Sequence, residues 1–263
     1  MNKKSVENSY VVFTQRGATT ILTLNRPQQL NPIGLAMRYE LMDRMREAIE
    51  DISCRTIVIT GAGGNFTAGG NVKEMKQHSL DEGRKRASYL ANMFKMFIDC
   101  PKPVISAIEG NCMGMGVSIV GASDFAIAAD NARFSLAFIK VNLMPDLGAT
   151  WSLPRKMGYR KTMELAATGD HFTAAQALEY NLLNSLTQPG QSLEKALVLA
   201  DKLNSNPPAA FAMLKRALNG AADTIESTIA NETESCGFLN SMQDHGEAAA
   251  AFKEKRKPVF KGQ

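Results

Sequence analysis

The sequence predicts an α/β fold, in which short buried strands alternate with amphipathic helices. Residues 55–60 and 103–108 are β-branched and apolar runs that end at glycines, as buried strands often do. Residues 35–52 repeat apolar side chains at i, i+3 and i+4 with charges between them, the spacing of a helix with one buried face. This alternation of strand and helix predicts an α/β chain with crossover connections.

The remaining elements follow in order along the chain. Residues 10–14 and 20–25 are β-rich runs separated by Arg16-Gly17, which predicts an antiparallel pair. A helix is expected over 84–99, and further strands over 125–128 and 134–136. Thr173-Ala-Ala-Gln176 fits a capping box that starts another helix.

The β-type patterns stop near residue 200. Pro207-Pro208 opens a helix rich in Ala, Met and Leu, and two more helical stretches are expected at 223–240 and 244–256. We therefore expect a core over 1–200 and a helical C-terminal segment over 201–263. The segment ends in the charged run Lys253-Glu-Lys-Arg-Lys257.

Composition narrows the function classes. Of the 263 residues, 44% are hydrophobic and 21% charged, as in an ordinary globular protein. The net charge of +4 is small and not concentrated in a basic segment, so nucleic acid is not the expected partner. Neither a membrane span nor a secretory signal is expected. The four cysteines and three histidines are scattered, so we expect reduced thiols, no metal site and a cytoplasmic location.

Two glycine-rich turns follow predicted strands. Residues 61–70 contain Gly61, Gly63, Gly64, Gly69 and Gly70, and residues 110–116 form a second turn of the same kind. Neither matches the dinucleotide fingerprint or a P-loop. Each turn could be a tight connection, or it could let the backbone approach a negatively charged ligand group at a helix start.

Four segments together resemble the crotonase (enoyl-CoA hydratase/isomerase) superfamily. They are Leu24–Asn31, Gly64–Met75 with its Phe-x-Ala-Gly core, Pro101–Gly116 and Phe134–Gly158, and the tail Phe252–Phe260 is also similar. The resemblance implies a crotonase-like spiral core of repeated ββα units with a helical C-terminal appendage. It also implies an acyl-coenzyme A (acyl-CoA) substrate, no metal or redox cofactor, and a homotrimer or dimer of trimers whose tail helps to close the active site.

The same resemblance assigns the site residues. Backbone N–H groups of Ala68 and Met115 would form an oxyanion hole, with Met115 standing where the family usually has glycine. Lys253 and Lys257 could supply charge for the coenzyme A phosphates, because the uncharged Gln28 stands where a Lys or Arg is usual. Substrate contacts are expected from Gln28, Leu30, Phe66, Gly69, Gly70, Asn71 and Phe138.

The acidic residues decide which reaction the resemblance implies. The two glutamates of the family's hydratases are replaced by Ser118 and Phe138, whereas Asp146 occupies the position of the single acid in its isomerases. Such a carboxylate could shuttle a proton, and burial would raise its pKa. Asp146 could instead cap a helix over 147–156. The expected function is acyl-CoA isomerisation; a hydratase or hydrolase using water at Asp146, and a non-catalytic acyl-CoA binder, remain alternatives.

Overall fold

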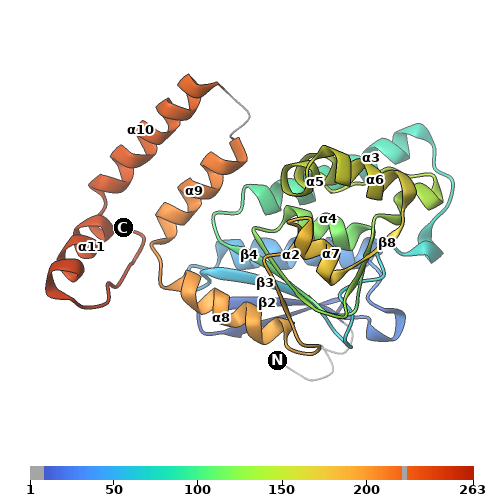
Figure 1. The fold of residues 1–263 in the computed structure, drawn as a ribbon, viewed down its shortest axis with the longest axis horizontal. Coiled ribbons are helices and arrows are strands. Elements are labelled where there is room, and N and C mark those ends of the chain that lie inside the picture. The colour runs from blue at the N-terminus through green and yellow to red at the C-terminus, as the bar shows by residue number, and fades with distance from the viewer. Residues whose placement is uncertain (1–8, 221–223) are drawn as a thin grey trace.

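A six-stranded sheet forms the centre of the chain, as described by a computed structural model for residues 9–220 and 224–263 (Figure 1). The strand order is β1-β2-β3-β4-β6-β9, antiparallel between β1 and β2 and parallel elsewhere. The strands of this sheet are β1 (Val11–Arg16), β2 (Thr19–Leu24), β3 (Thr56–Gly61), β4 (Val104–Ile108), β6 (Phe125–Ala129) and β9 (Ser185–Thr187). The predicted α/β class and the antiparallel N-terminal pair are thus confirmed.

Helices connect the strands and cover both faces of the sheet. They are α2 (Leu35–Glu50), α3 (Leu80–Ile98), α4 (Met115–Ala122), α5 (Ala149–Met157), α6 (Tyr159–Thr168), α7 (Ala174–Glu179) and α8 (Ser192–Asn204), with short 3-10 turns η1 (Pro27–Gln29), η2 (Val72–Glu74) and η3 (Ala137–Val141). A small second sheet holds β5 (Asn111–Met113), β7 (Arg133–Ser135) and β8 (His171–Thr173). The predicted capping box of Thr173 and Gln176 is present at the start of α7.

The central strands are apolar on both faces because helices pack against each side. Ile57 and Ile59 of β3 enter the main core with α2 and α3, whereas Val58 joins a second core cluster with Leu197 of α8. This alternation is what a strand with a two-residue period produces when both of its faces are buried. α8 runs past position 200, where the predicted core ends, and still packs on the sheet.

The C-terminal helices α9 (Pro208–Gly220), α10 (Ile225–Ser241) and α11 (Gln243–Glu254) extend away from the sheet (Figure 1). Residue 223, where the second of these was expected to start, lies outside the described residues. Described apolar side chains on the extension are exposed, among them Leu218, Ile225 and Phe238. No helix among the described residues is both long and apolar enough to cross a bilayer.

Candidate active site

The two glycine-rich turns lie against each other at the carboxyl ends of β3 and β4. Thr67 of the first turn pairs with Cys112 of the second, since its amide donates to the Asn111 carbonyl at 2.8 Å and its carbonyl accepts the Met113 amide at 3.0 Å. Gly69 has a φ of +91°, and a Cβ there would lie 2.8 Å from the Met113 carbonyl oxygen. Glycine is therefore required for this close approach.

Backbone hydrogen bonds show which amides of the first turn are available. The Ala68 N–H donates to the Leu30 carbonyl at 2.7 Å, and the Gly69 N–H donates to the Thr67 Oγ1 at 2.9 Å. Ala68 was therefore the wrong choice of oxyanion donor, because the neighbouring segment that ends at Leu30 occupies its N–H. Among the described residues, the Gly70 N–H meets no acceptor, so the available donor lies two residues further along.

In the second turn the Met115 amide has no acceptor among the described residues, and its role as an oxyanion donor stays a prediction. Met115 is the first residue of α4, where backbone N–H groups have no acceptor within the helix. Within the described chain the Met115 N–H has no acceptor, while the preceding Gly114 N–H donates to the Ser135 carbonyl at 2.8 Å. The Met115 side chain is only 2% exposed and packs in the main core. Its side chain therefore forms no wall of the cavity described below, and only its amide is available to a ligand.

The amides of Gly70 and Met115 follow two glycines that are in contact. A Cβ on Gly114 would lie 3.9 Å from the Gly69 Cα. Two unsatisfied N–H groups on adjoining turns, one of them at a helix N-terminus, can hold a single negatively charged oxygen. This pair has the donor set of an oxyanion hole.

Gly70 opens into a cavity of about 370 Å3 that also contains Asp146. The cavity is bordered by the starts of α2 and α3, by residues 70–78 and by the loop that ends at Asp146. Its other linings include Arg38, Asn71, Glu74, Arg86 and Leu90. Met115 and Phe138 do not line the cavity. They lie beside Gly114, which is adjacent to Gly69 and so to the residue before Gly70.

Asp146 is not the helix cap that the sequence allows as an alternative. α5 begins at Ala149 with Gly148 as its N-cap, and no side chain caps it. The Asp146 Oδ1 is buried and has no hydrogen-bond partner. Burial raises the pKa of this carboxyl to about 6, while the positive charge of Arg38 partly opposes that rise. Asp146 is thus a carboxylate poised to exchange a proton near neutral pH.

The second acid of the cavity is already bonded. The Glu74 carboxylate accepts the Leu35 amide at 2.9 Å and the Asn71 side-chain amide at 2.8 Å, so it caps the start of α2 and holds the loop. The Asn71 Oδ1 also accepts the Lys73 amide. In the described part of the cavity, the Asp146 carboxylate is therefore the one with a buried oxygen, Oδ1, that lacks a hydrogen-bond partner.

Several predicted substrate contacts lie elsewhere. Phe66 is fully buried in the main core and presents no surface to the cavity, which corrects its assignment. Phe138 is 7% exposed, and its ring faces the position a Cβ on Gly114 would take. Gln28 and Leu30 are exposed in and after η1, which packs on the first turn through Pro27. Their contact with coenzyme A stays a prediction.

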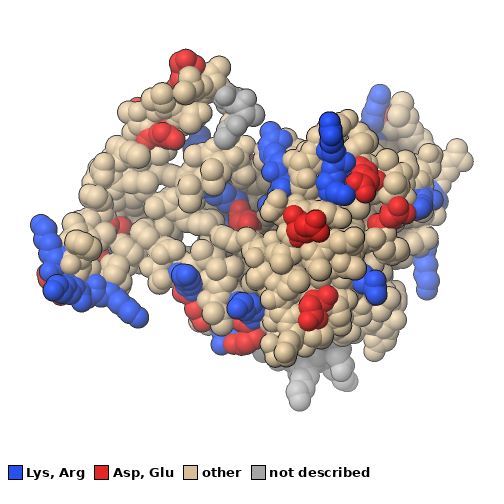
Figure 2. Space-filling view, in the orientation of Figure 1, with Lys and Arg blue, Asp and Glu red and all other residues tan. Residues whose placement is uncertain are grey.

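The C-terminal lysines lie far from this cavity within the same chain. α11 and α3 are at opposite ends of the molecule in Figure 1. Figure 2 shows basic side chains gathered where α11 ends. Arg256 is paired with Glu247 and Glu254 there, whereas Lys253 and Lys257 form no ion pair among the described residues. They cannot close the site of their own chain in this arrangement.

Arg38 is a site residue that the sequence analysis missed. It sits on α2 one helical turn before the buried Leu41, on the border of the apolar stripe formed by Met37, Leu41 and Met45. A charged residue beside such a buried stripe could have indicated a site, because a buried arginine needs a polar cavity or an acidic partner.

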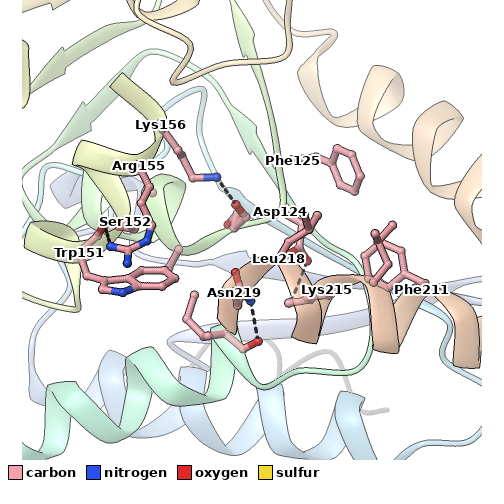
Figure 3. Close-up of a pocket in the computed structure, with 15 residues that line it drawn as sticks. Asp124, Phe125, Trp151, Ser152, Arg155, Lys156, Phe211, Lys215, Leu218 and Asn219 are labelled. Carbon is pink, nitrogen blue, oxygen red and sulfur yellow. Dashed lines mark hydrogen bonds and ion pairs between the residues drawn. The ribbon is translucent and has the colours of Figure 1, made fainter. Parts of the chain in front are cut away.

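A second cavity, of about 410 Å3, lies beneath α9 and contains a buried ion pair (Figure 3). The Lys215 Nζ reaches the Asp124 carboxylate at 2.8 Å, and the Lys156 Nζ donates to the Ser123 carbonyl at 3.1 Å. The Asp124 carboxylate also accepts the Val104 amide at 2.8 Å. The charges of Asp124 and Lys215 are satisfied within the chain, so this cavity joins α9 to the core and, among the described residues, offers no free acid or side-chain amide.

The chain is similar to known proteins over almost its whole length. A family model described as enoyl-CoA hydratase/isomerase matches residues 14–263. The chain is 32% identical to the short-chain-enoyl-CoA hydratase of Clostridium acetobutylicum, over 96% of this chain and 97% of the relative. It is 31% identical to the 1,2-epoxyphenylacetyl-CoA isomerase of Escherichia coli, over 94% and 96% respectively.

The fold is also that of a solved relative. The crystal structure of an enoyl-CoA hydratase from Bacillus anthracis superposes with a TM-score of 0.91 at 32% identity, covering 97% of this chain and all of that one. Hydratase and isomerase names both occur at this level of similarity. The chain therefore belongs to the enoyl-CoA hydratase/isomerase family, the crotonases, and is an acyl-CoA-processing enzyme.

Proposed function

We propose that this enzyme is an acyl-CoA isomerase, which moves a double bond or rearranges a ring in a coenzyme A thioester through an enolate. The observation that carries the proposal is the buried carboxylate of Asp146, whose Oδ1 has no hydrogen-bond partner, in the cavity reached by the free Gly70 amide. A lone base beside an oxyanion hole suits removal of a proton from one carbon and its return to another.

For a 3-enoyl thioester the steps balance as follows. The thioester oxygen lies between the N–H groups of Gly70 and Met115. Asp146 takes the proton from C2, and the electron pair of that C–H bond enters the enolate, placing negative charge on the held oxygen. The protonated Asp146 then returns the proton to C4 as the double bond moves to C2–C3. No electrons are gained or lost, so we propose that no metal or redox cofactor takes part.

The residues at the two hydratase positions support isomerisation over hydration. Ser118 has a fully buried hydroxyl with no hydrogen-bond partner, so nothing activates it as a base. Phe138 has no group that can carry a proton. Glu74 is held by two hydrogen bonds. A second acid that could split water together with Asp146 is therefore missing from the described site.

Product analysis by mass spectrometry tests the proposal. Incubation with 3-enoyl and ring-bearing thioesters should give products of unchanged mass with the double bond or ring rearranged, whereas hydration would add one water. Crotonyl-CoA should remain unhydrated. Hydration of crotonyl-CoA at about 10 turnovers per second, an ordinary enzymatic rate, would contradict the proposal.

We also propose that the chain works as a homotrimer or a dimer of trimers, in which Lys253 and Lys257 of a neighbouring copy approach the coenzyme A phosphates. The exposed apolar side chains of α9 and α10 support this, because single chains rarely expose such a series on one extension. Sedimentation velocity would reveal the assembly. A monomer at micromolar concentration, or unchanged thioester affinity in the Lys253→Ala/Lys257→Ala variant, would contradict it.

A further inference from the structure

Arg38 places a guanidinium group beside the amide that would hold the thioester oxygen. Its Nε donates to the Ile33 carbonyl at 3.1 Å, which fixes the side chain over the start of α2. Its Nη2 lies 3.9 Å from the position a Cβ on Gly70 would occupy. The outer nitrogens of Arg38 have no acceptor among the described residues, although they border the cavity.

A second guanidinium group enters the same cavity from α3. Arg86 lines it, and its charge acts against that of Arg38, lowering the pKa of Arg38 in addition to the larger effect of burial. Neither arginine is in an ion pair within the described chain, in contrast to Arg44 on α2 and Arg84 on α3. Two like charges facing one cavity are unfavourable unless an anion lies between them.

The acids of the cavity are too few to balance these charges. Glu74 already binds the Leu35 amide and the side chain of Asn71. Asp146 is close enough to influence the pKa of Arg38, yet the two form no ion pair. The other ionisable linings, Lys76 and His78, add no negative charge. With Lys76, three basic side chains border the cavity against the two carboxylates of Glu74 and Asp146, which leaves one positive charge in excess.

We propose that the acyl group of the substrate carries its own carboxylate, which Arg38 binds with Arg86 nearby. This rests on the proposed function, because the amide of Gly70 marks the thioester end of the acyl group. The Nη2 of Arg38 lies near that end, so the carboxylate belongs on a short chain. A planar guanidinium group suits a carboxylate, with which it can form two parallel hydrogen bonds.

Binding of saturated thioesters tests this without requiring turnover. Calorimetry would compare glutaryl-CoA and adipyl-CoA, which end in a carboxylate, with valeryl-CoA and hexanoyl-CoA, which do not. The wild type should bind the carboxylated member of each pair about tenfold more tightly or better, as a charge-assisted hydrogen bond allows. Arg38→Met should abolish the preference while leaving valeryl-CoA binding nearly unchanged.

Arg84→Met is the matched control, because Arg84 lies on α3 but is 72% exposed and paired with Asp81. It should keep the wild-type preference, and thermal melting should show that both variants fold. Equal binding of the two thioester classes by the wild type, or a preference that survives Arg38→Met, would overturn the carboxylate proposal and leave the isomerase proposal standing. Failure of every thioester to bind would overturn the proposed function itself.

Discussion

Replacing Asp146 by asparagine should stabilise the protein and remove its activity. Burial lifts the pKa of this carboxyl from 3.8 to about 6, so the folded state favours the protonated form. Stability is then greatest below about pH 3.8 and falls as pH rises through 6, because the ionised carboxylate is less well solvated in the fold than in the unfolded chain. The difference between the pKa values of 3.8 and about 6 corresponds to a loss of about 3 kcal/mol of unfolding free energy above pH 6.

Urea unfolding of the wild type and Asp146→Asn measures this effect. The variant should be more stable by about 3 kcal/mol near pH 8 but by only about 1 kcal/mol near pH 4.5, where the folded carboxyl is already protonated. Asp81→Asn is a suitable control, since Asp81 is 86% exposed on α3 and should show no such pH-dependent gain.

Activity of the same variant should fall by about 10²-fold to 10⁴-fold, the range for loss of a general base. Thioester binding should persist, because Asn keeps the size of the side chain and the oxyanion amides belong to other residues. A variant that is no more stable near pH 8 would refute the burial argument. A variant that turns over like the wild type would refute the role of Asp146 as the base.

Three further perturbations follow from the contacts of the site. The kcat/KM of the wild type should rise with pH and level off above about 6, because Asp146 must be ionised to accept a proton; a flat profile between about pH 5 and 8 would contradict this. Gly69→Ala should lower kcat and stability, since its φ is +91° and a Cβ would strike backbone, whereas Gly237→Ala on the exposed helix α10 should be harmless; equal effects in activity assays and melts would refute the close-approach argument. Lys215→Met should destabilise the fold by about 3 kcal/mol in denaturant unfolding, because it leaves Asp124 buried without its ion-pair partner. Adding Asp124→Asn should restore much of this loss, and a Lys215→Met variant as stable as the wild type would contradict the role of the ion pair.

Periodicity predicted most of the secondary structure because buried strands and amphipathic helices leave a local signal. β3, β4, α2 and the helix cap at Thr173 fall where the apolar and capping patterns place them. α3 starts earlier than expected, at Leu80, although Ser79 and Glu82 form a capping box that is visible in the sequence. The start was missed because the following residues are mostly polar.

The site was predicted less completely because it depends on contacts between distant segments. Which amide of the first turn is free depends on the path of Leu30 and Asn31, both of which adopt positive φ without being glycine. Positive φ is uncommon outside glycine and, although asparagine favours it more than most residues, nothing in the sequence indicates it for Leu30. Asp146 could be found from its position, but its burial and the neighbouring charge of Arg38 arise only when α2 meets the loop before α5.

Exchange of substrate hydrogen with deuterated water tests the central claim most directly. Enolate formation requires Asp146 to break the C2–H bond, so NMR of a 3-enoyl thioester incubated with the wild type in D2O should show deuterium at C2 and a 2-enoyl product. Asp146→Asn should show neither, although it binds the thioester. Undiminished exchange in the variant, or a 3-hydroxyacyl product formed as fast as the 2-enoyl isomer, would contradict the account.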